Sequence, residues 1–213
     1  DKIQREPVEV TFSAEAAERG GFEHFMMKEI HEQPKAVADT LGSLIKDGRI
    51  DLSGAGLDQE GMAKVRDIIV VACGSAWHVG MACQYVIEDL TDISVRVELA
   101  SEFRYRKPRF RADTLVLVIS QSGETADTLA ALRLAKENDV PTLAIVNVVG
   151  SSIAREADHV IYTLAGPEIA VATTKAYSTQ LIAGYCLAVQ LGFVKGMIDE
   201  EAYAHYLDEL LLI

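Results

Sequence analysis

The side chains best suited to chemistry in this sequence lie in one short stretch, Ser120-Gln121-Ser122-Gly123-Glu124-Thr125. Five uninterrupted apolar residues precede it, and an Ala/Leu-rich stretch with helical spacing follows. This order predicts a strand buried on both faces, a tight loop and a helix. The loop then presents hydroxyls, an amide and backbone N–H groups beside the positive end of a helix dipole, an arrangement that binds anions. Because the loop contains no lysine, it is not a Walker loop, and its neutral donors favour a sugar phosphate over a nucleotide–magnesium pair.

Two other loops carry hydroxyl side chains at equivalent places in the predicted fold. Ser75 follows an earlier apolar run, and Thr173 and Thr174 follow a later one. The carboxyl ends of parallel strands meet at one edge of a sheet, so we expect these loops to lie beside residues 120–125. For each loop alone, ordinary helix N-capping by serine or threonine remains an alternative. Together the loops favour a phosphorylated, polyhydroxylated ligand, with its phosphate on residues 120–125 and its hydroxyls on the other two loops.

Five short apolar runs alternate with helical patterns through the middle of the chain. This alternation predicts βαβ units, and right-handed crossovers between parallel strands place helices on both faces of the sheet. We therefore predict an α/β fold, a doubly wound, five-stranded parallel sheet with helices on both faces. The expected strands are residues 67–72, 93–98, 115–119, 142–147 and 159–163, and the main expected helices are residues 77–90, 126–136 and 176–191, with a last one from Asp199.

The chain before the first strand is less regular. Residues 1–20 are polar, and we interpret them as an interdomain linker, with residues 21–213 forming one lobe that begins with helices. Helical spacing of apolar residues predicts helices at 21–32 and 37–48, separated or kinked at Pro34. The chain does not begin with Met and stops inside an apolar helical pattern, so we expect a piece of a longer protein.

The composition argues against several classes of partner. A formal net charge of −12 disfavours nucleic acid and anionic membranes, which need clustered Lys and Arg. No secretory signal is recognisable, and no apolar run approaches the roughly 20 residues that span a bilayer. The three cysteines are scattered among apolar residues without metal-binding spacing. We therefore expect reduced thiols in a cytoplasmic protein, with no metal and no cofactor.

Weaker candidates are spread along the chain. Gly54-Ala55-Gly56 lacks the preceding strand of a dinucleotide-binding loop, and Ser122 lacks the glycine that a hydrolase's nucleophile elbow has two residues earlier. Glu124 is expected either to complement a helix dipole or to contact a sugar or a partner lobe. Lys175 lies near a helix start, where a cation is unfavourable, which suggests a ligand or another subunit. The basic stretch 104–111 is either a solvated loop or a surface that pairs with a partner subunit.

Several stretches together resemble a known family. SQSGETADT, at residues 120–128, is similar to the phosphate loop of the sugar isomerase (SIS) domain. Four others resemble, more narrowly, the glutamine–fructose-6-phosphate aminotransferases, also called glucosamine-6-phosphate synthases: FMMKEIHEQP (25–34), ACGSA (72–76), ASEFRYR (100–106) and VATTKA (171–176). The resemblance runs from about residue 8 to about residue 191, and such long motifs in the same order are specific together.

The resemblance implies a division of labour. Members of that family join a glutaminase domain to two tandem SIS lobes, and the resemblance covers the interdomain segment and the first lobe only. In the family, the lysine, glutamate and histidine of the isomerisation belong to the other parts, so no catalytic residue is assigned to this chain. The resemblance implies phosphate binding by Ser120, Gln121, Ser122 and Thr125, and sugar contacts from Ser75, Thr173 and the backbone near Val171.

The resemblance also implies an enzyme that converts fructose-6-phosphate and glutamine to glucosamine-6-phosphate and glutamate. We expect this chain alone to bind the substrate without turnover, and to work with the glutaminase domain and the second SIS lobe as a homodimer. Ala76, where many members have serine, puts one sugar contact in doubt. Two alternatives stay open: a non-catalytic, sugar-phosphate-sensing SIS regulatory module, and an amino-sugar deglycase or isomerase. The stretch at residues 28–34, typical of the synthase, argues against the first.

Overall fold

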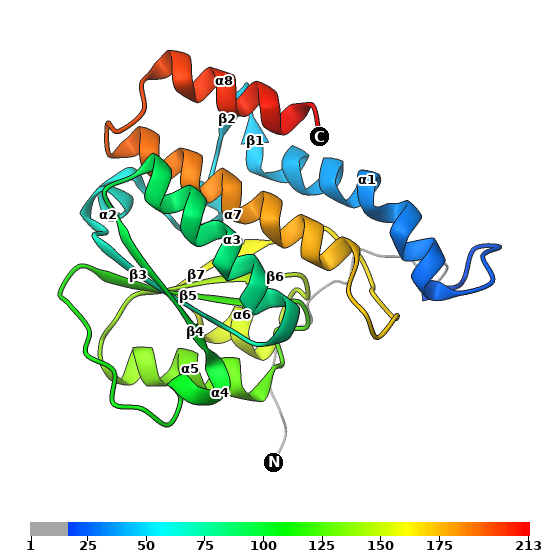
Figure 1. The fold of residues 1–213 in the computed structure, drawn as a ribbon, viewed down its shortest axis with the longest axis horizontal. Coiled ribbons are helices and arrows are strands. Elements are labelled where there is room, and N and C mark those ends of the chain that lie inside the picture. Colours follow the sequence, from blue (N-terminus) through cyan, green and yellow to red (C-terminus); the bar gives the residue numbers. More distant parts are fainter. Residues whose placement is uncertain (1–16) are drawn as a thin grey trace, which may run out of the picture.

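A five-stranded parallel sheet forms the centre of the computed structural model, which describes residues 17–213 (Figure 1). The strand order across the sheet is β4-β3-β5-β6-β7, and neighbouring strands pair in parallel throughout. The predicted fold class is therefore confirmed. Most of the expected linker at residues 1–20 lies outside the described residues. The strands are β3 (Asp67–Ala72), β4 (Ser94–Leu99), β5 (Thr114–Ser120), β6 (Thr142–Val146) and β7 (His159–Tyr162).

The three central strands are buried on both faces, which explains their uninterrupted apolar sequences. Every residue of β3, β5 and β6 is buried. Successive side chains point to opposite faces of a strand, so one run of apolar residues supplies two cores. In β3, Ile68 and Val70 belong to one core, and Ile69 and Val71 to the other.

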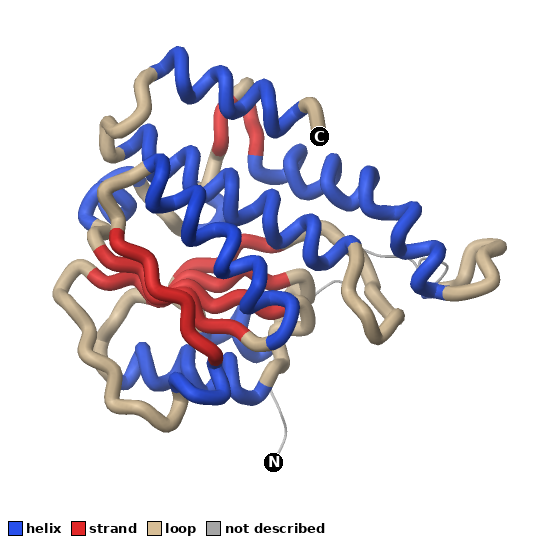
Figure 2. The backbone as a smooth tube through the Cα atoms, viewed as in Figure 1, coloured by secondary structure: helices blue, strands red, loops and turns tan. Residues whose placement is uncertain are grey.

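Helices cover both faces of the sheet (Figure 2). The helices on one side are α1 (Phe25–Leu44), α3 (Gly74–Leu90), α7 (Lys175–Val194) and α8 (Glu200–Leu211), and those on the other are α4 (Ala100–Phe103), α5 (Ala126–Glu137) and α6 (Ser152–Glu156). Helix α7 is apolar on nearly all sides because it packs against the sheet, α1 and α3. Its Gly184 lies so close to Cys83 of α3 that the crossing leaves no room for a side chain.

The sheet reverses its order of connection between β3 and β5. From β3 the chain moves outward to the edge strand β4, and it then returns to β5 on the other side of β3 and continues to β6 and β7. In doubly wound sheets, ligands bind at the carboxyl ends of the strands beside such a reversal. The start of α3 and the loop 121–125 therefore flank the expected binding position.

Helix α1 corrects one expectation from the sequence. It is a single helix from Phe25 to Leu44 that contains Pro34, so the predicted separation into two helices is wrong. Proline cannot donate the hydrogen bond that the Ile30 carbonyl would receive in a regular helix. The side-chain Nε2 of Gln33 donates to that carbonyl instead, at 3.4 Å, and packing of α1 along α7 supports the helix on its buried face.

A small hairpin after α1 was also missed. Strands β1 (Ile45–Lys46) and β2 (Arg49–Ile50) pair antiparallel where the sequence predicts the end of a helix. The hairpin is tied to α8, because the Tyr203 hydroxyl accepts a hydrogen bond from the Ile50 N–H at 2.7 Å. A 3₁₀ helix, η2 (Ser53–Ala55), and a short helix, α2 (Gln59–Lys64), lead into β3. Within residues 17–213, no helix is both long enough and apolar enough to cross a membrane.

Candidate functional site

A cavity of about 260 Å³ lies at the carboxyl edge of the sheet, beside the reversal of strand order. All seven residues that the sequence analysis assigned to phosphate or sugar binding line it: Ser75, Ser120, Gln121, Ser122, Thr125, Val171 and Thr173. Three loops that are far apart in the sequence therefore meet as predicted. The cavity has six further lining residues, which are Cys73, Ala76, Ile119, Glu168, Ala170 and Gln180.

The loop 120–125 is held in shape by its own hydroxyl groups. The buried Ser120 Oγ lies 2.9 Å from Thr125 Oγ1 and accepts a hydrogen bond from the Gly123 N–H at 3.1 Å. Ser122 Oγ accepts one from the Glu124 N–H at 3.2 Å. Gly123 has a positive φ of 65°, which reverses the chain over a short distance. The loop is therefore preorganised, with Ser122 half-buried at the cavity.

The electrostatics of the cavity come from helix ends. Helices α3, α5 and α7 all begin at this edge, so their positive dipole ends and first-turn N–H groups gather around the cavity. Thr125 is the N-cap residue of α5, yet its side chain makes no capping bond, because its hydroxyl pairs with Ser120. The first turn of α5 is thus free to donate to an anion. None of the lining residues is Lys or Arg.

Glu124 has a role that the sequence analysis did not anticipate. Its Oε1 accepts a hydrogen bond from the Ser152 N–H at 2.7 Å, so it caps the start of α6. The same hydrogen bond lowers the pKa of the Glu124 carboxyl. The Gly123 carbonyl also accepts from the Ile153 N–H at 3.0 Å. The side chain of Ser151, the N-cap residue of α6, makes no capping bond. Helix α6 and the loop 120–125 therefore hold each other in place.

Glu168 positions the third wall of the cavity. One carboxylate oxygen accepts a hydrogen bond from Thr173 Oγ1 at 3.0 Å. The other accepts from the Thr174 N–H at 2.9 Å and the Ala176 N–H at 3.1 Å, and so caps the start of α7. The hydroxyl of Thr173 is thus oriented by an acidic side chain from its own loop. Val171, in contrast, is fully exposed at the rim.

Helix α1 anchors this loop from outside the sheet. The buried Glu29 carboxylate accepts hydrogen bonds from the Ile169 N–H at 2.6 Å and the Ala170 N–H at 3.1 Å. The Thr40 hydroxyl accepts one from the Leu164 N–H at 3.1 Å. These bonds link residues more than a hundred positions apart, and they explain why the stretch at 25–34 accompanies the cavity motifs.

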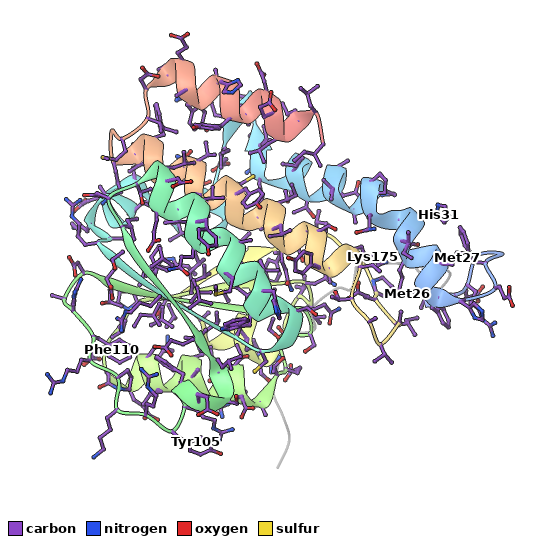
Figure 3. The ribbon with its side chains drawn as sticks, viewed as in Figure 1. Met26, Met27, His31, Tyr105, Phe110 and Lys175 are labelled. Atoms are coloured by element: carbon purple, nitrogen blue, oxygen red, sulfur yellow. The ribbon has the colours of Figure 1, made fainter. Side chains whose placement is uncertain are left out.

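Lys175 also belongs to this anchor. It lies at the start of α7, where α7 faces α1 (Figure 3), and its Nζ is 2.6 Å from Glu32 Oε2. Only 3% of its surface is exposed, and it does not line the cavity. The unfavourable position at a helix start is therefore offset by an ion pair within the chain, where the sequence suggested a ligand or another subunit.

The basic stretch 104–111 likewise finds partners inside the chain. Arg104 pairs with Asp127 at the start of α5 at 2.6 Å, and Arg106 pairs with Glu98 of β4 at 2.9 Å. These contacts stabilise the loop before β5. Lys107, Arg109 and Arg111 are exposed, which agrees with the expected solvated loop, and the alternative of a surface that pairs with a partner subunit stays a prediction.

Comparison with known proteins assigns the family. Residues 61–190 match the model of the SIS domain. The chain belongs to the SIS domain family. The matched region includes β3 to β7 and most of α7, and therefore the whole sheet and all three loops at the cavity.

This SIS domain is similar to part of several named enzymes. It is 54% identical over 213 residues to glutamine–fructose-6-phosphate aminotransferase of Clostridium tetani and 52% identical over 210 residues to that of Caldanaerobacter subterraneus. A solved structure, the C-terminal domain of glucosamine-fructose-6-phosphate aminotransferase from Francisella tularensis, matches with a TM-score of 0.87 and 41% identity, covering 92% of this chain and 55% of that one. The chain spans 35% and 34% of the length of the two curated relatives.

Other parts of the SIS domain are less suited to a phosphorylated ligand. A larger cavity of about 410 Å³ lies at the opposite, amino edge of the sheet, where its walls are mostly apolar side chains such as Leu57, Met62 and Leu187. It lacks the clustered hydroxyls of the first cavity. Among residues 17–213, no group of three or more His, Cys, Asp or Glu side chains could hold a metal ion.

Sequence reasoning missed several residues of the cavity and its support, and three of them carry polar side chains that matter to the site. Glu168 and Gln180 line the cavity, and Glu29 holds one of its loops. Glu168 caps α7 from across the preceding loop, whereas the N-cap position itself is Thr174, so its position along the chain offered no capping signal. Glu29 and Gln180 carry no local signal, because their partners or surroundings come from distant parts of the chain.

Cys73 offers a chemical probe of the cavity. It is half-buried and lines the cavity, whereas Cys83 and Cys186 are fully buried, and burial raises the pKa of both of these thiols to about 12. Because the thiolate is the reactive form, we expect iodoacetamide to label one thiol of the native chain, Cys73, and all three in urea. Peptide mass spectrometry locates the label. Labelling of Cys83 or Cys186 in the native chain at a rate like that of Cys73 would contradict the burial described here.

Proposed function

We propose that this SIS domain is the sugar-phosphate-binding first lobe of the isomerase part of a glutamine–fructose-6-phosphate aminotransferase. The observation that carries the proposal is the meeting of the loop 120–125, Ser75 and Thr173 at one cavity. Identity above 50% to aminotransferases of this name supports the same assignment. The ligand would be fructose-6-phosphate or glucosamine-6-phosphate, with its phosphate on the loop and its hydroxyls toward Ser75 and Thr173.

The site geometry fits an anchoring role. A phosphate remote from the reacting carbons supplies binding energy that orients the rest of the substrate. Isomerisation between adjacent carbons also needs a base and an imine-forming amine. Among the described residues that line the cavity, Glu168 is the one carboxylate, and its oxygens are already engaged by Thr173 and the start of α7. We therefore propose that this chain alone binds the sugar phosphate without turnover.

The remaining groups would come from partners. We propose a glutaminase domain and a second SIS lobe as parts of the complete enzyme, which would transfer the amide nitrogen of glutamine to the sugar. A homodimer and a cytoplasmic location remain our predictions, and the three free cysteines support the latter. Turnover of fructose-6-phosphate by the pure chain would contradict the non-catalytic role.

Two serine variants test the assignment of the two ends of the ligand. Ser122→Ala removes a hydroxyl assigned to the phosphate, so we expect it to weaken fructose-6-phosphate binding about tenfold and to leave fructose binding nearly unchanged, since hydrogen bonds to charged groups are the stronger ones. Ser75→Ala, the matched control, should weaken binding of both ligands to a similar degree. Titration calorimetry, or protection of Cys73 from iodoacetamide, measures both affinities. Equal losses for the two ligands in Ser122→Ala would refute the phosphate assignment.

A further inference from the structure

Gln180 is a buried polar side chain whose donor is unused. It lies on α7, it is 3% exposed, and it lines the cavity together with Ser75, Ser122 and Thr173. Its Nε2 is inaccessible to solvent and has no hydrogen-bond partner among the described residues. Nearly all buried polar side chains in proteins are paired, and an unpaired donor lowers the stability of the fold. A chain that keeps such a group at a cavity therefore gains something from it there.

The other polar side chains of α7 make this contrast clear. Ser178 Oγ donates to Gln33 Oε1 at 2.6 Å, and Thr179 Oγ1 donates to the Ala176 carbonyl at 3.1 Å. Gln190 is the best comparison, because it is the same residue type on the same helix and is 7% exposed, yet its Oε1 accepts from the Tyr203 hydroxyl at 3.2 Å. Among the side chains of α7, Gln180 is the one that has a solvent-inaccessible polar atom without a hydrogen-bond partner in the described chain.

Two of the hydroxyl groups that line the cavity are already hydrogen-bonded within the chain, so a ligand there would need further polar partners. Ser120 Oγ is engaged by Thr125 and Gly123, and Thr173 Oγ1 is engaged by Glu168. A carboxamide offers both donors and an acceptor, and rotation about its last torsion exchanges the side that faces the cavity. A sugar hydroxyl can accept from Nε2 or donate to Oε1, whereas a fully ionised phosphate can accept from Nε2 but has no proton to donate to Oε1.

We propose that the Gln180 carboxamide binds a hydroxyl of the sugar and thereby selects a sugar phosphate over bare phosphate. This inference rests on the proposed function, and it adds a specificity-determining residue on α7 to the three loops. The anionic end of the ligand would stay on the loop 120–125, and Gln180 would read the uncharged part. The amide would then be unpaired in the free protein and would gain a hydrogen-bond partner when the ligand binds.

The test compares Gln180→Leu with Gln190→Leu. For Gln180→Leu we expect a higher melting temperature of the free chain, because a buried unpaired donor is removed, together with about tenfold weaker binding of fructose-6-phosphate and unchanged binding of inorganic phosphate. Gln190→Leu should lower the melting temperature, because it removes the acceptor of the buried Tyr203 hydroxyl, and should leave both affinities unchanged. Differential scanning fluorimetry and calorimetry give these values, and Gln180→Met serves as a second variant if the leucine variant does not fold.

Each other outcome overturns the proposal. A lower melting temperature with unchanged affinities would mean that Gln180 is structural and satisfied by water. Equal losses for fructose-6-phosphate and inorganic phosphate would mean that the substitution disturbs the cavity as a whole. The unaltered chain shows which of the two proposals has failed. If it binds no fructose-6-phosphate, the proposed function is wrong, and Ser122→Ala has no effect to measure. If it binds fructose-6-phosphate but Gln180→Leu does not have the expected effects, only the role proposed for Gln180 is wrong.

Discussion

A Gly123→Ala variant is expected to lose roughly 2–5 kcal/mol of unfolding free energy, the sum of a left-handed backbone at a non-glycine residue and an overpacked contact. The φ of Gly123 is 65°, which side chains other than glycine rarely adopt. An added Cβ would also lie 2.5 Å from Ser151 Cβ and closer still to Ser151 Oγ. Ser151 Cβ is fixed to its backbone, so either the loop 120–125 or the start of α6 would have to move.

The same substitution should abolish measurable binding of fructose-6-phosphate. The Gly123 N–H donates to Ser120 Oγ, and the Gly123 carbonyl accepts from the Ile153 N–H. Displacement of this residue therefore changes both the phosphate loop and its contact with α6. Urea unfolding monitored by circular dichroism measures the loss of stability, and protection of Cys73 from iodoacetamide reports the loss of binding.

Two controls separate the backbone effect from the steric one. Gly196 has a similar φ of 69°, and no atom lies within 4 Å of an added Cβ there, so Gly196→Ala should lose only the backbone contribution of about 1–2 kcal/mol. The double variant Gly123→Ala/Ser151→Gly lacks the clashing atoms. Its loss of unfolding free energy should therefore fall to that of Gly196→Ala. Ser151→Gly is mild on its own, because the Ser151 side chain makes no capping bond. If Gly123→Ala and Gly196→Ala lost the same unfolding free energy, the contact with Ser151 would add no cost of its own.

The sheet and the meeting of the loops were predictable for a simple physical reason. Strands buried on both faces need continuous apolar sequence, and parallel strands end at the same edge, so Ser75 and Ser122 had to come close once the strands were placed. Local sequence therefore determined the position of the cavity. The chemistry assigned to its residues came from residue types and from the resemblance.

The features that were missed depend on contacts between distant residues. The hairpin β1–β2 has two residues in each strand, too few for a periodic pattern, and it is held by Tyr203 from the far end of the chain. Helix α1 continues through Pro34 because its buried face packs on α7. Glu124 appeared suited to its own helix, yet it caps α6, 28 residues later. In each case a tertiary contact overrides the preference of the local sequence.

A Glu29→Ala variant is expected to lose about 2–4 kcal/mol of unfolding free energy, because it removes hydrogen bonds to a charged acceptor and leaves two N–H groups without a partner. Glu29 is 2% exposed, and its carboxylate receives the N–H groups of Ile169 and Ala170. Those residues precede Val171 and Thr173 at the cavity. We therefore expect weaker binding of fructose-6-phosphate as well, measured by calorimetry, with stability taken from urea unfolding.

Asp39 on the same helix provides the control for Glu29. Its side chain is 42% exposed and forms an ion pair with Lys35, whose side chain is 78% exposed. Such surface ion pairs contribute roughly 0–1 kcal/mol to the free energy of unfolding. Asp39→Ala should therefore change neither stability nor binding appreciably. If Glu29→Ala were no more destabilising than Asp39→Ala, the loop 164–173 would not depend on α1. If it lowered stability but left fructose-6-phosphate binding unchanged, the loop would be fixed well enough by Glu168 alone, and α1 would support the fold without positioning the sugar contacts.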